Sequence, residues 1–164
     1  MRIVLFILAA LEAFDGLSNI STLFGIPGPI GIPTLFGDMS RLPKPFPGQF
    51  LVEAHIATHP VLALAAILFA ATGKVRGAIV ALGSIVVIRW VSYLPEAVLY
   101  VTAITAPREV VTLIGFVLSL LLAACAIACA LRNQRLGLAT LLLSVAVLFN
   151  LFVVVQSANA EPGC

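Results

Sequence analysis

The sequence predicts an all-α integral membrane protein, folded as one compact bundle of about five transmembrane helices, with four as the lower bound. Of its 164 residues 62% are hydrophobic and only 10% are charged, and the mean hydropathy is +1.17, well above that of a soluble domain. A bilayer core about 30 Å thick requires roughly 20 apolar residues per helix, so this length accommodates four or five spans and almost no extramembrane domain. We therefore expect a single transmembrane domain over residues 1–164.

The apolar segments that we expect to span the membrane are 3–24, 50–72, 78–100, 110–131 and 136–156. The first begins like a signal peptide, but Glu12 and Asp15 interrupt the apolar run and no clear cleavage site follows, so we expect it to remain as a span. Its second half is polar, and Glu12, Asp15 and Asn19 fall within about 60° of one another on a helix. This stripe should face protein and not lipid.

Residues 25–49 form an outer loop of a different character. Six prolines and five glycines exclude a regular helix there. Isoleucine and phenylalanine side chains keep the segment apolar, so we predict a structured Pro/Gly-rich loop that lies on or dips into the membrane surface. A disordered linker is the alternative.

The second and third predicted spans carry further ionisable side chains. Glu53, His55 and His59 precede Pro60, which we expect to kink or bend the second span. A turn at residues 73–77 with two cations leads to the third span, where one helical face carries three more polar groups. These three residues are Arg89, Tyr93 and Glu96.

The fourth and fifth spans are apolar and rich in small side chains, which allow helices to approach closely. We interpret the fourth as a packing helix and Asn150 in the fifth as the donor or acceptor of an interhelical hydrogen bond. The three cysteines of the chain do not form a disulfide framework. The small packing residues are Ala123, Ala124, Cys125, Ala126, Ala128 and Cys129.

The ionisable residues of the first three spans lie at similar depths, so we predict a polar chamber between these helices that opens toward the outer face. Four carboxyl groups accompany one obligate cation, and such an imbalance is costly in a low dielectric. Protons, a bound cation or a cationic group from a partner must make up the difference. The predicted members of this intramembrane polar cluster are Glu12, Asp15, Asn19, Glu53, His55, His59, Arg89, Tyr93 and Glu96.

Two interpretations of these residues stay open. His55 and His59 share a helical face and can bind a metal ion or haem together with a carboxylate from another helix; the alternative is that both only form hydrogen bonds. Arg89 lies too far from either end of its span to reach water. It either forms a structural ion pair with Asp15 or Glu12 or has a functional role.

The cations predict the orientation. Five expected spans place Arg2, the 73–77 turn and the 132–135 turn on one side, where they carry cations without acids. By the positive-inside rule the N-terminus is cytoplasmic and the C-terminus outside, as in a bacterial inner membrane. The net charge of +2 is small and spread over short loops, which argues against nucleic-acid binding and against a polybasic lipid-binding patch.

No nucleotide loop, nucleophile triad, zinc-protease helix or cysteine redox pair is present in the sequence. We therefore expect first a non-catalytic subunit or assembly component of a larger membrane complex, with the bilayer and other membrane subunits or further copies of the chain as partners. The alternatives are a small proton- or ion-coupled carrier or channel that uses the polar cluster, and a membrane-embedded metal, haem or quinone oxidoreductase.

Overall fold

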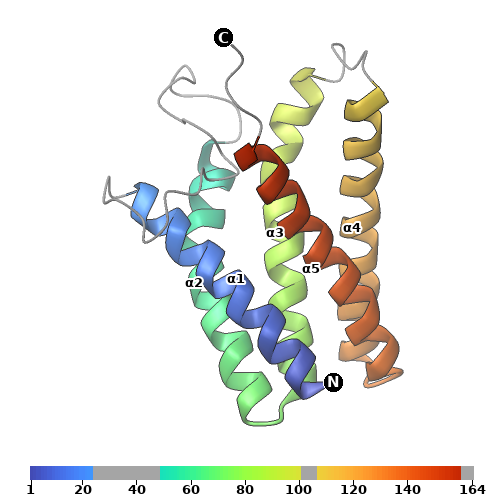
Figure 1. Cartoon of the computed structure of the whole chain (residues 1–164). Helices are drawn as coiled ribbons and strands as arrows, with labels where there is room; N and C mark the ends of the chain where they lie inside the picture. The colour runs from blue at the N-terminus through green and yellow to red at the C-terminus, as the bar shows by residue number, and fades with distance from the viewer. Residues whose placement is uncertain (24–48, 101–106, 160–164) are drawn as a thin grey trace.

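A computed structural model of the chain describes residues 1–23, 49–100 and 107–159, and the side chains at 1–17, 50–92 and 114–152. The described residues form helices and turns and no strand. The predicted Pro/Gly loop at 25–49 lies almost entirely outside them. The five helices, which alternate in direction (Figure 1), are α1 (Arg2–Leu23), α2 (Gln49–Ala71), α3 (Val75–Tyr100), α4 (Pro107–Leu131) and α5 (Leu136–Asn159).

Each predicted span corresponds to one helix, and the largest differences, of three residues each, are at the starts of α3 and α4 and at the end of α5, which reaches Asn159 and not residue 156. α4 begins at Pro107, three residues before the predicted start, because proline is well suited to the first turn of a helix, where its missing N–H is not needed. α3 begins at Val75 and not at Ala78, because the turn before it is shorter than predicted.

The turn between α2 and α3 is a Schellman motif closed by one glycine. Gly73 has φ +77°, and its amide donates to the carbonyl of Ala70, while the amide of Lys74 donates to the carbonyl of Phe69. Glycine adopts this left-handed conformation without a Cβ clash. The helix therefore ends and the next one begins within a few residues.

The turn between α4 and α5 repeats this design with asparagine in place of glycine. Asn133, at φ 54°, donates to the carbonyl of Ala130, and Gln134 donates to that of Cys129. Arg76 of α3 reaches the same helix end, where its Nε and Nη2 donate to the carbonyls of Ala130 and Leu131. The end of α4 is thus held by its own turn and by α3.

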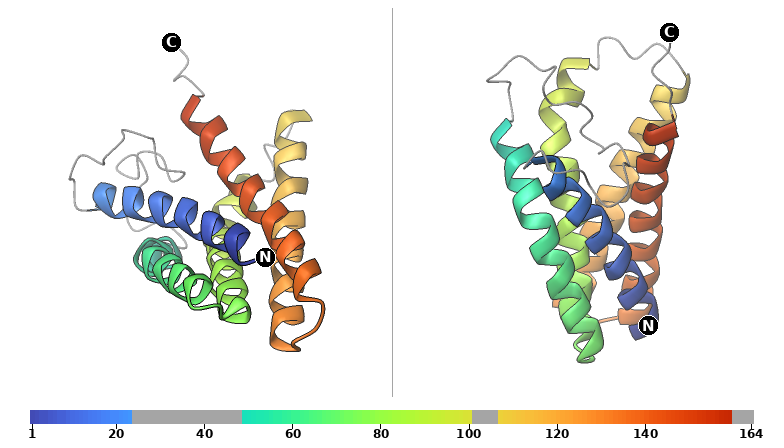
Figure 2. Two further views of the ribbon diagram at one scale, coloured as in Figure 1. Left: turned by 60° about the horizontal axis from the view of Figure 1, so that its bottom comes forward. Right: turned by 60° about the vertical axis from the view of Figure 1, so that its left-hand side comes forward.

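α3 lies at the centre of the bundle and contacts each of the other four helices. α2 and α1 cover one side of it, and α4 and α5 cover the other, as the two turned views in Figure 2 show. Its inward side chains are fully buried, namely Ala78, Ile79, Leu82, Ile85, Val86 and Arg89.

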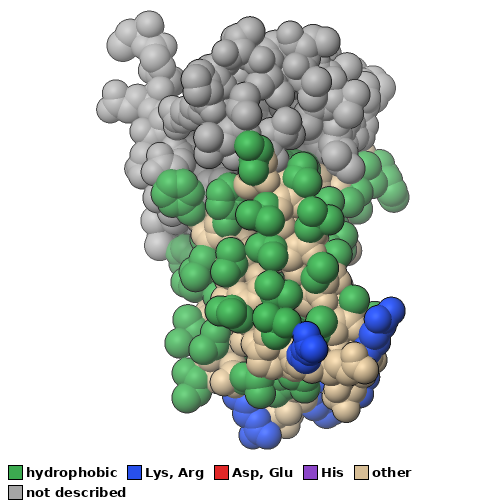
Figure 3. Space-filling view, turned by 90° about the vertical axis from the view of Figure 1, so that its right-hand side faces the viewer, with side chains coloured by type: hydrophobic (Ala, Val, Ile, Leu, Met, Phe, Trp, Pro, Cys, Tyr) green, Lys and Arg blue, Asp and Glu red, His purple; other side chains and the backbone are tan. Residues whose placement is uncertain are grey.

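Three helical segments among the described residues are long and apolar enough to cross a membrane, namely Phe50–Ala71, Val75–Ser92 and Ile114–Leu131. The described apolar part of α5, Leu136–Phe152, is shorter. Large hydrophobic side chains cover the outer surface of the bundle between its ends (Figure 3).

Candidate functional site

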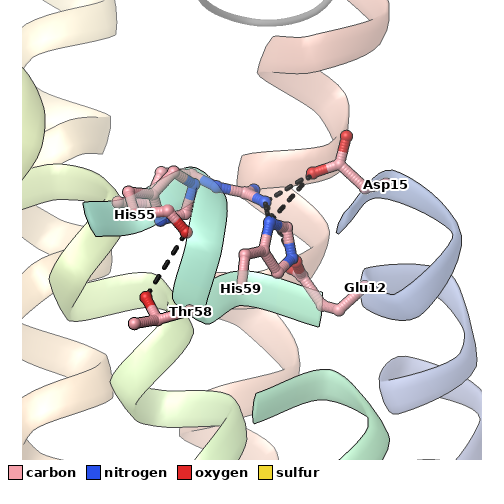
Figure 4. A network of polar contacts seen from close by, with 6 residues as sticks. Glu12, Asp15, His55, Thr58 and His59 are labelled. Carbon is pink, nitrogen blue, oxygen red and sulfur yellow. Dashed lines mark hydrogen bonds and ion pairs between the residues drawn. The ribbon is translucent and has the colours of Figure 1, made fainter. Parts of the chain in front are cut away.

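Four ionisable side chains from α1, α2 and α3 meet inside the bundle, and we call them the ionic cluster: Glu12, Asp15, His59 and Arg89. Nη2 of Arg89 donates to Oε2 of Glu12 at 3.0 Å and to Oδ2 of Asp15 at 2.5 Å. Nε2 of His59 lies 2.8 Å from the same Oε2 of Glu12 (Figure 4). Glu12 and His59 are 0% exposed and Arg89 1%, whereas the Asp15 side chain is 13% exposed.

These residues lie at similar distances from one end of the bundle because α1, α2 and α3 alternate in direction. At 1.5 Å per residue, Glu12, His59 and Arg89 lie roughly 15–20 Å from the end of the bundle where α1 begins. Glu12 and Asp15, three residues apart on α1, share the face that turns toward α2 and α3. Arg89 therefore reaches both carboxylates with one nitrogen.

A close approach of two backbones holds α1 against α2 beside the ionic cluster. A Cβ on Gly16 would lie 3.2 Å from two backbone atoms of Pro60 and 3.3 Å from the ring of His59. Pro60 stands inside α2 and has no amide hydrogen to donate. Sequence reasoning missed this contact, although Gly16 follows Glu12 by one turn and lies on the same side of α1.

The geometry also indicates the tautomer of His59. Nη2 of an arginine has two hydrogens, and the two carboxylates are its nearest acceptors, while the nitrogens of His59 lie further away, at 3.4 and 3.5 Å. With Glu12 ionised, its carboxylate only accepts, so Nε2 of His59 is then the donor of this hydrogen bond. Its Nδ1 faces Oδ2 of Asp15 at 4.0 Å.

His55, the second histidine of the chain, lies next to the ionic cluster. It is buried, and its ring stacks on that of His59 with 5.1 Å between the centroids. The hydroxyl of Thr58 donates to the carbonyl of Ala54 at 2.7 Å, and it also lies 3.4 Å from the carbonyl of His55, the contact that Figure 4 marks. The two histidines thus lie on one face of α2, and His59 is bonded to the carboxylate of Glu12 on α1.

The residues that could bind a metal ion differ from the pair His55 and His59 that the sequence suggested. The group whose donor atoms lie within 4.8 Å of one another is Glu12, Asp15 and His59, without His55. Both carboxylates of that group are already bonded to the guanidinium of Arg89. This guanidinium contacts both carboxylates and supplies one positive charge at the place where a metal ion would have to bind.

The other predicted members of the polar cluster are divided. Glu53 is exposed on α2, on a different face from the buried His55 and His59. Asn19, Tyr93 and Glu96 stand in the helices, but their side chains lie outside the described residues.

The predicted packing residues of α4 also divide into two faces. Ala123 and Ala126 are buried, Cys129 is half-buried against the core, and the others, Ala124, Cys125 and Ala128, are exposed. Asn150 of α5 is 0% exposed, and neither of its amide atoms has a hydrogen-bond partner within the described part of the chain. The interhelical hydrogen bond that we expect of Asn150 therefore has no described partner.

Comparisons of the chain with protein-family models, with curated proteins and with solved structures found no match. The functional argument therefore depends on the geometry of the site.

Proposed function

We propose that this chain is a multi-pass membrane protein that binds and moves protons through the ionic cluster, as a small proton-coupled carrier or channel. Two observations support a membrane location: three apolar helices are long enough to cross a bilayer, and many large hydrophobic side chains are exposed. A bacterial inner membrane with the N-terminus in the cytoplasm agrees with the cations at the end where α1 begins.

The observation that carries the proposal is the charge of the ionic cluster. With His59 neutral, the carboxylates of Glu12 and Asp15 and the guanidinium of Arg89 leave one net negative charge in a buried site. One proton makes the site neutral, and burial favours the neutral state. In this proposal one proton completes the balance, and no cationic group from a partner is needed.

The proton has two positions that preserve the existing ion pairs. Oε1 of Glu12 is buried and has no hydrogen-bond partner among the described residues, while Oε2 accepts from both Arg89 and His59. Nδ1 of His59 is the other position, where a proton would strengthen the interaction with Asp15. Asp15, the most exposed member, is the point of contact with the surroundings.

The groups that bear on this titration come from three helices. α1 contributes Glu12 and Asp15, α2 contributes His55 and His59, and α3 contributes Arg89. The described side chains of α5, which also packs against α1 and α3, include no acid and no histidine. Ionisable residues inside a bilayer most often mark ion or proton pathways, which favours this function over a purely structural one.

Infrared difference spectroscopy of the reconstituted protein tests the proposal. A pH step should produce the carboxylic-acid band of one protonated side chain, and Glu12→Gln should remove or displace it. Proteoliposomes with an internal pH indicator should show protein-dependent proton movement that Glu12→Gln reduces at least tenfold. Glu53→Gln, which removes an exposed carboxylate, is the matched control and should behave as wild type. Identical spectra and fluxes for wild type and Glu12→Gln would contradict the proposal.

A second candidate function is that of a non-catalytic subunit in a larger membrane complex. The observation that favours it is the outward face of α4, where Ala124, Cys125 and Ala128 are exposed. Small residues on a membrane helix permit close approach of another helix. Native mass spectrometry of the gently extracted protein tests it, since this role requires other polypeptides that Ala124→Leu with Ala128→Leu should displace.

A further inference from the structure

Five cationic side chains gather at one end of the bundle, and we call this surface the basic end: Arg2, Lys74, Arg76, Arg132 and Arg135. We propose that the basic end is a binding site for the headgroups of anionic phospholipids. The proposal depends on the proposed function only in that the chain lies in a bilayer, and it is independent of proton binding. The small net charge argued against a polybasic lipid-binding patch, although the expected topology places these cations on one side. The present proposal departs from that expectation because the fold gathers the cations around one surface.

The fold brings three segments of the chain together at this end. The start of α1 lies between the two turns: the guanidinium of Arg2 lies against Gly73, where an added Cβ would meet it at 2.6 Å, and Sδ of Met1 lies 4.0 Å from the Cβ position of Gly137. Cations from α1, from the α2–α3 turn and from the α4–α5 turn thus surround one end of the molecule. Figure 3 shows basic side chains at the lower end, below the hydrophobic surface.

The basic end lacks compensating acids within the described residues. The described carboxylates are those of Glu12 and Asp15, on α1 well above this end, and of Glu53, near the opposite end of α2. All five cationic residues are exposed. The result is a surface of a single charge sign, to which anionic groups are attracted.

Two of the five cations have structural roles, and three remain for a ligand. Arg76 donates to the end carbonyls of α4, and Arg2 packs on Gly73. Within the part of the chain that the structure describes, the side chains of Lys74, Arg132 and Arg135 form neither a hydrogen bond nor an ion pair. Their charged ends are therefore available to phosphate oxygens.

The expected depth of the basic end in the bilayer favours phospholipid headgroups as its ligand. The ionic cluster lies roughly 15–20 Å from this end, about half the thickness of a bilayer core, so the basic end reaches the headgroup level when the cluster is near the bilayer centre. The exposed hydrophobic residues Ile3 and Leu131 are the chain neighbours of Arg2 and Arg132, so apolar surface for acyl chains adjoins the cations. A phospholipid can therefore place its phosphate against the cations and its acyl chains against the adjoining apolar surface.

The test uses the full chain purified in an uncharged detergent and offered equal amounts of phosphatidylglycerol and phosphatidylcholine with identical acyl chains. Native mass spectrometry counts the retained lipids. A cation near an anionic lipid contributes about a fivefold preference, so Lys74→Gln with Arg132→Gln and Arg135→Gln should lower the preference for phosphatidylglycerol on the order of 100-fold. Detergent has no inside or outside, so a role of the cations in setting membrane orientation does not affect the result.

The matched control keeps the charges: Lys74→Arg with Arg132→Lys and Arg135→Lys should retain the preference of wild type. Glu12→Gln should retain it as well, which separates this proposal from proton binding. Thermal unfolding in phosphatidylcholine alone verifies that each variant is folded, and the single variant Arg132→Gln, with an expected loss of about fivefold, replaces the triple one if that fails. Equal retention of the two lipids by wild type, or an unchanged preference in the glutamine variants, overturns the proposal.

Discussion

The two sides of the central helix α3 are held together by different interactions. α1 and α2 meet α3 around buried charges, with Arg89 bonded to Glu12 and Asp15. α4 and α5 meet α3 and each other through small and apolar side chains, such as Ala123 and Ala146. Apolar packing has no charge to neutralise, whereas the ionic cluster is stable only with every partner present. The cluster side is therefore suited to respond to protons and the packing side to support it.

Arg89→Ala should lower the free energy of unfolding more than any other single change on the side of α1 and α2, because it leaves two carboxylates at the buried site without their cation. Loss of one partner of a buried ion pair costs about 3–5 kcal/mol in the free energy of unfolding. Titration with sodium dodecyl sulfate in mixed micelles measures this value. Addition of Glu12→Gln and Asp15→Asn to the same chain should recover a large part of the loss, and a failure to recover it would mean that Arg89 acts through packing and not through charge.

Gly16→Leu should have the next largest effect, because its side chain meets the backbone of Pro60 and the ring of His59. Overpacking of this kind costs about 2–3 kcal/mol in the free energy of unfolding and separates α1 from α2. Proton uptake should fall together with stability. The control is Gly137→Leu, which is exposed and has Met1 at 4.0 Å as its nearest neighbour, and which should remain within about 0.5 kcal/mol of wild type. Equal effects at the two glycines would contradict the assigned contact.

Gly115→Ala tests the packing side and should have the smallest effect of the three. An added Cβ would overlap the end of the Phe149 ring at 2.0 Å, so the ring must move. We expect a loss of about 1 kcal/mol in the free energy of unfolding, since alanine also favours the helix. Phe149→Leu in the same chain should relieve the clash, and a double-mutant cycle measures the coupling. Proton uptake should be unchanged, and a parallel loss of uptake would show that the two sides are not separable.

Much of the fold was predictable because it depends on local sequence and on solvent. Apolar runs of sufficient length predict the five helices, since a helix satisfies its own backbone hydrogen bonds. The stripe of Glu12 and Asp15 on one helical face follows from the helical repeat alone. An ion pair of Arg89 with Asp15 or Glu12 was one of the two interpretations of this residue, because a buried charge needs a partner, and the structure shows both pairs.

Other features required the tertiary structure. Helical spacing places His55 and His59 on one face, but only the rotation of α2 against α1 decides that His59 meets Glu12. The same rotation leaves Glu53 exposed, although it stands only two residues before the buried His55 on the same helix.

The sequence by itself determined which segments are helices and which residues of those segments are charged. Contacts between the helices determine which of these charges meet, and they bring the cations of α1 and of the two turns around one surface. The physical reason is that helix formation depends on neighbours three and four residues away, whereas the ionic cluster and the basic end depend on the positions of whole helices. Those positions are set by contacts between residues far apart in the chain, such as Gly16 with Pro60 and Arg76 with the end of α4.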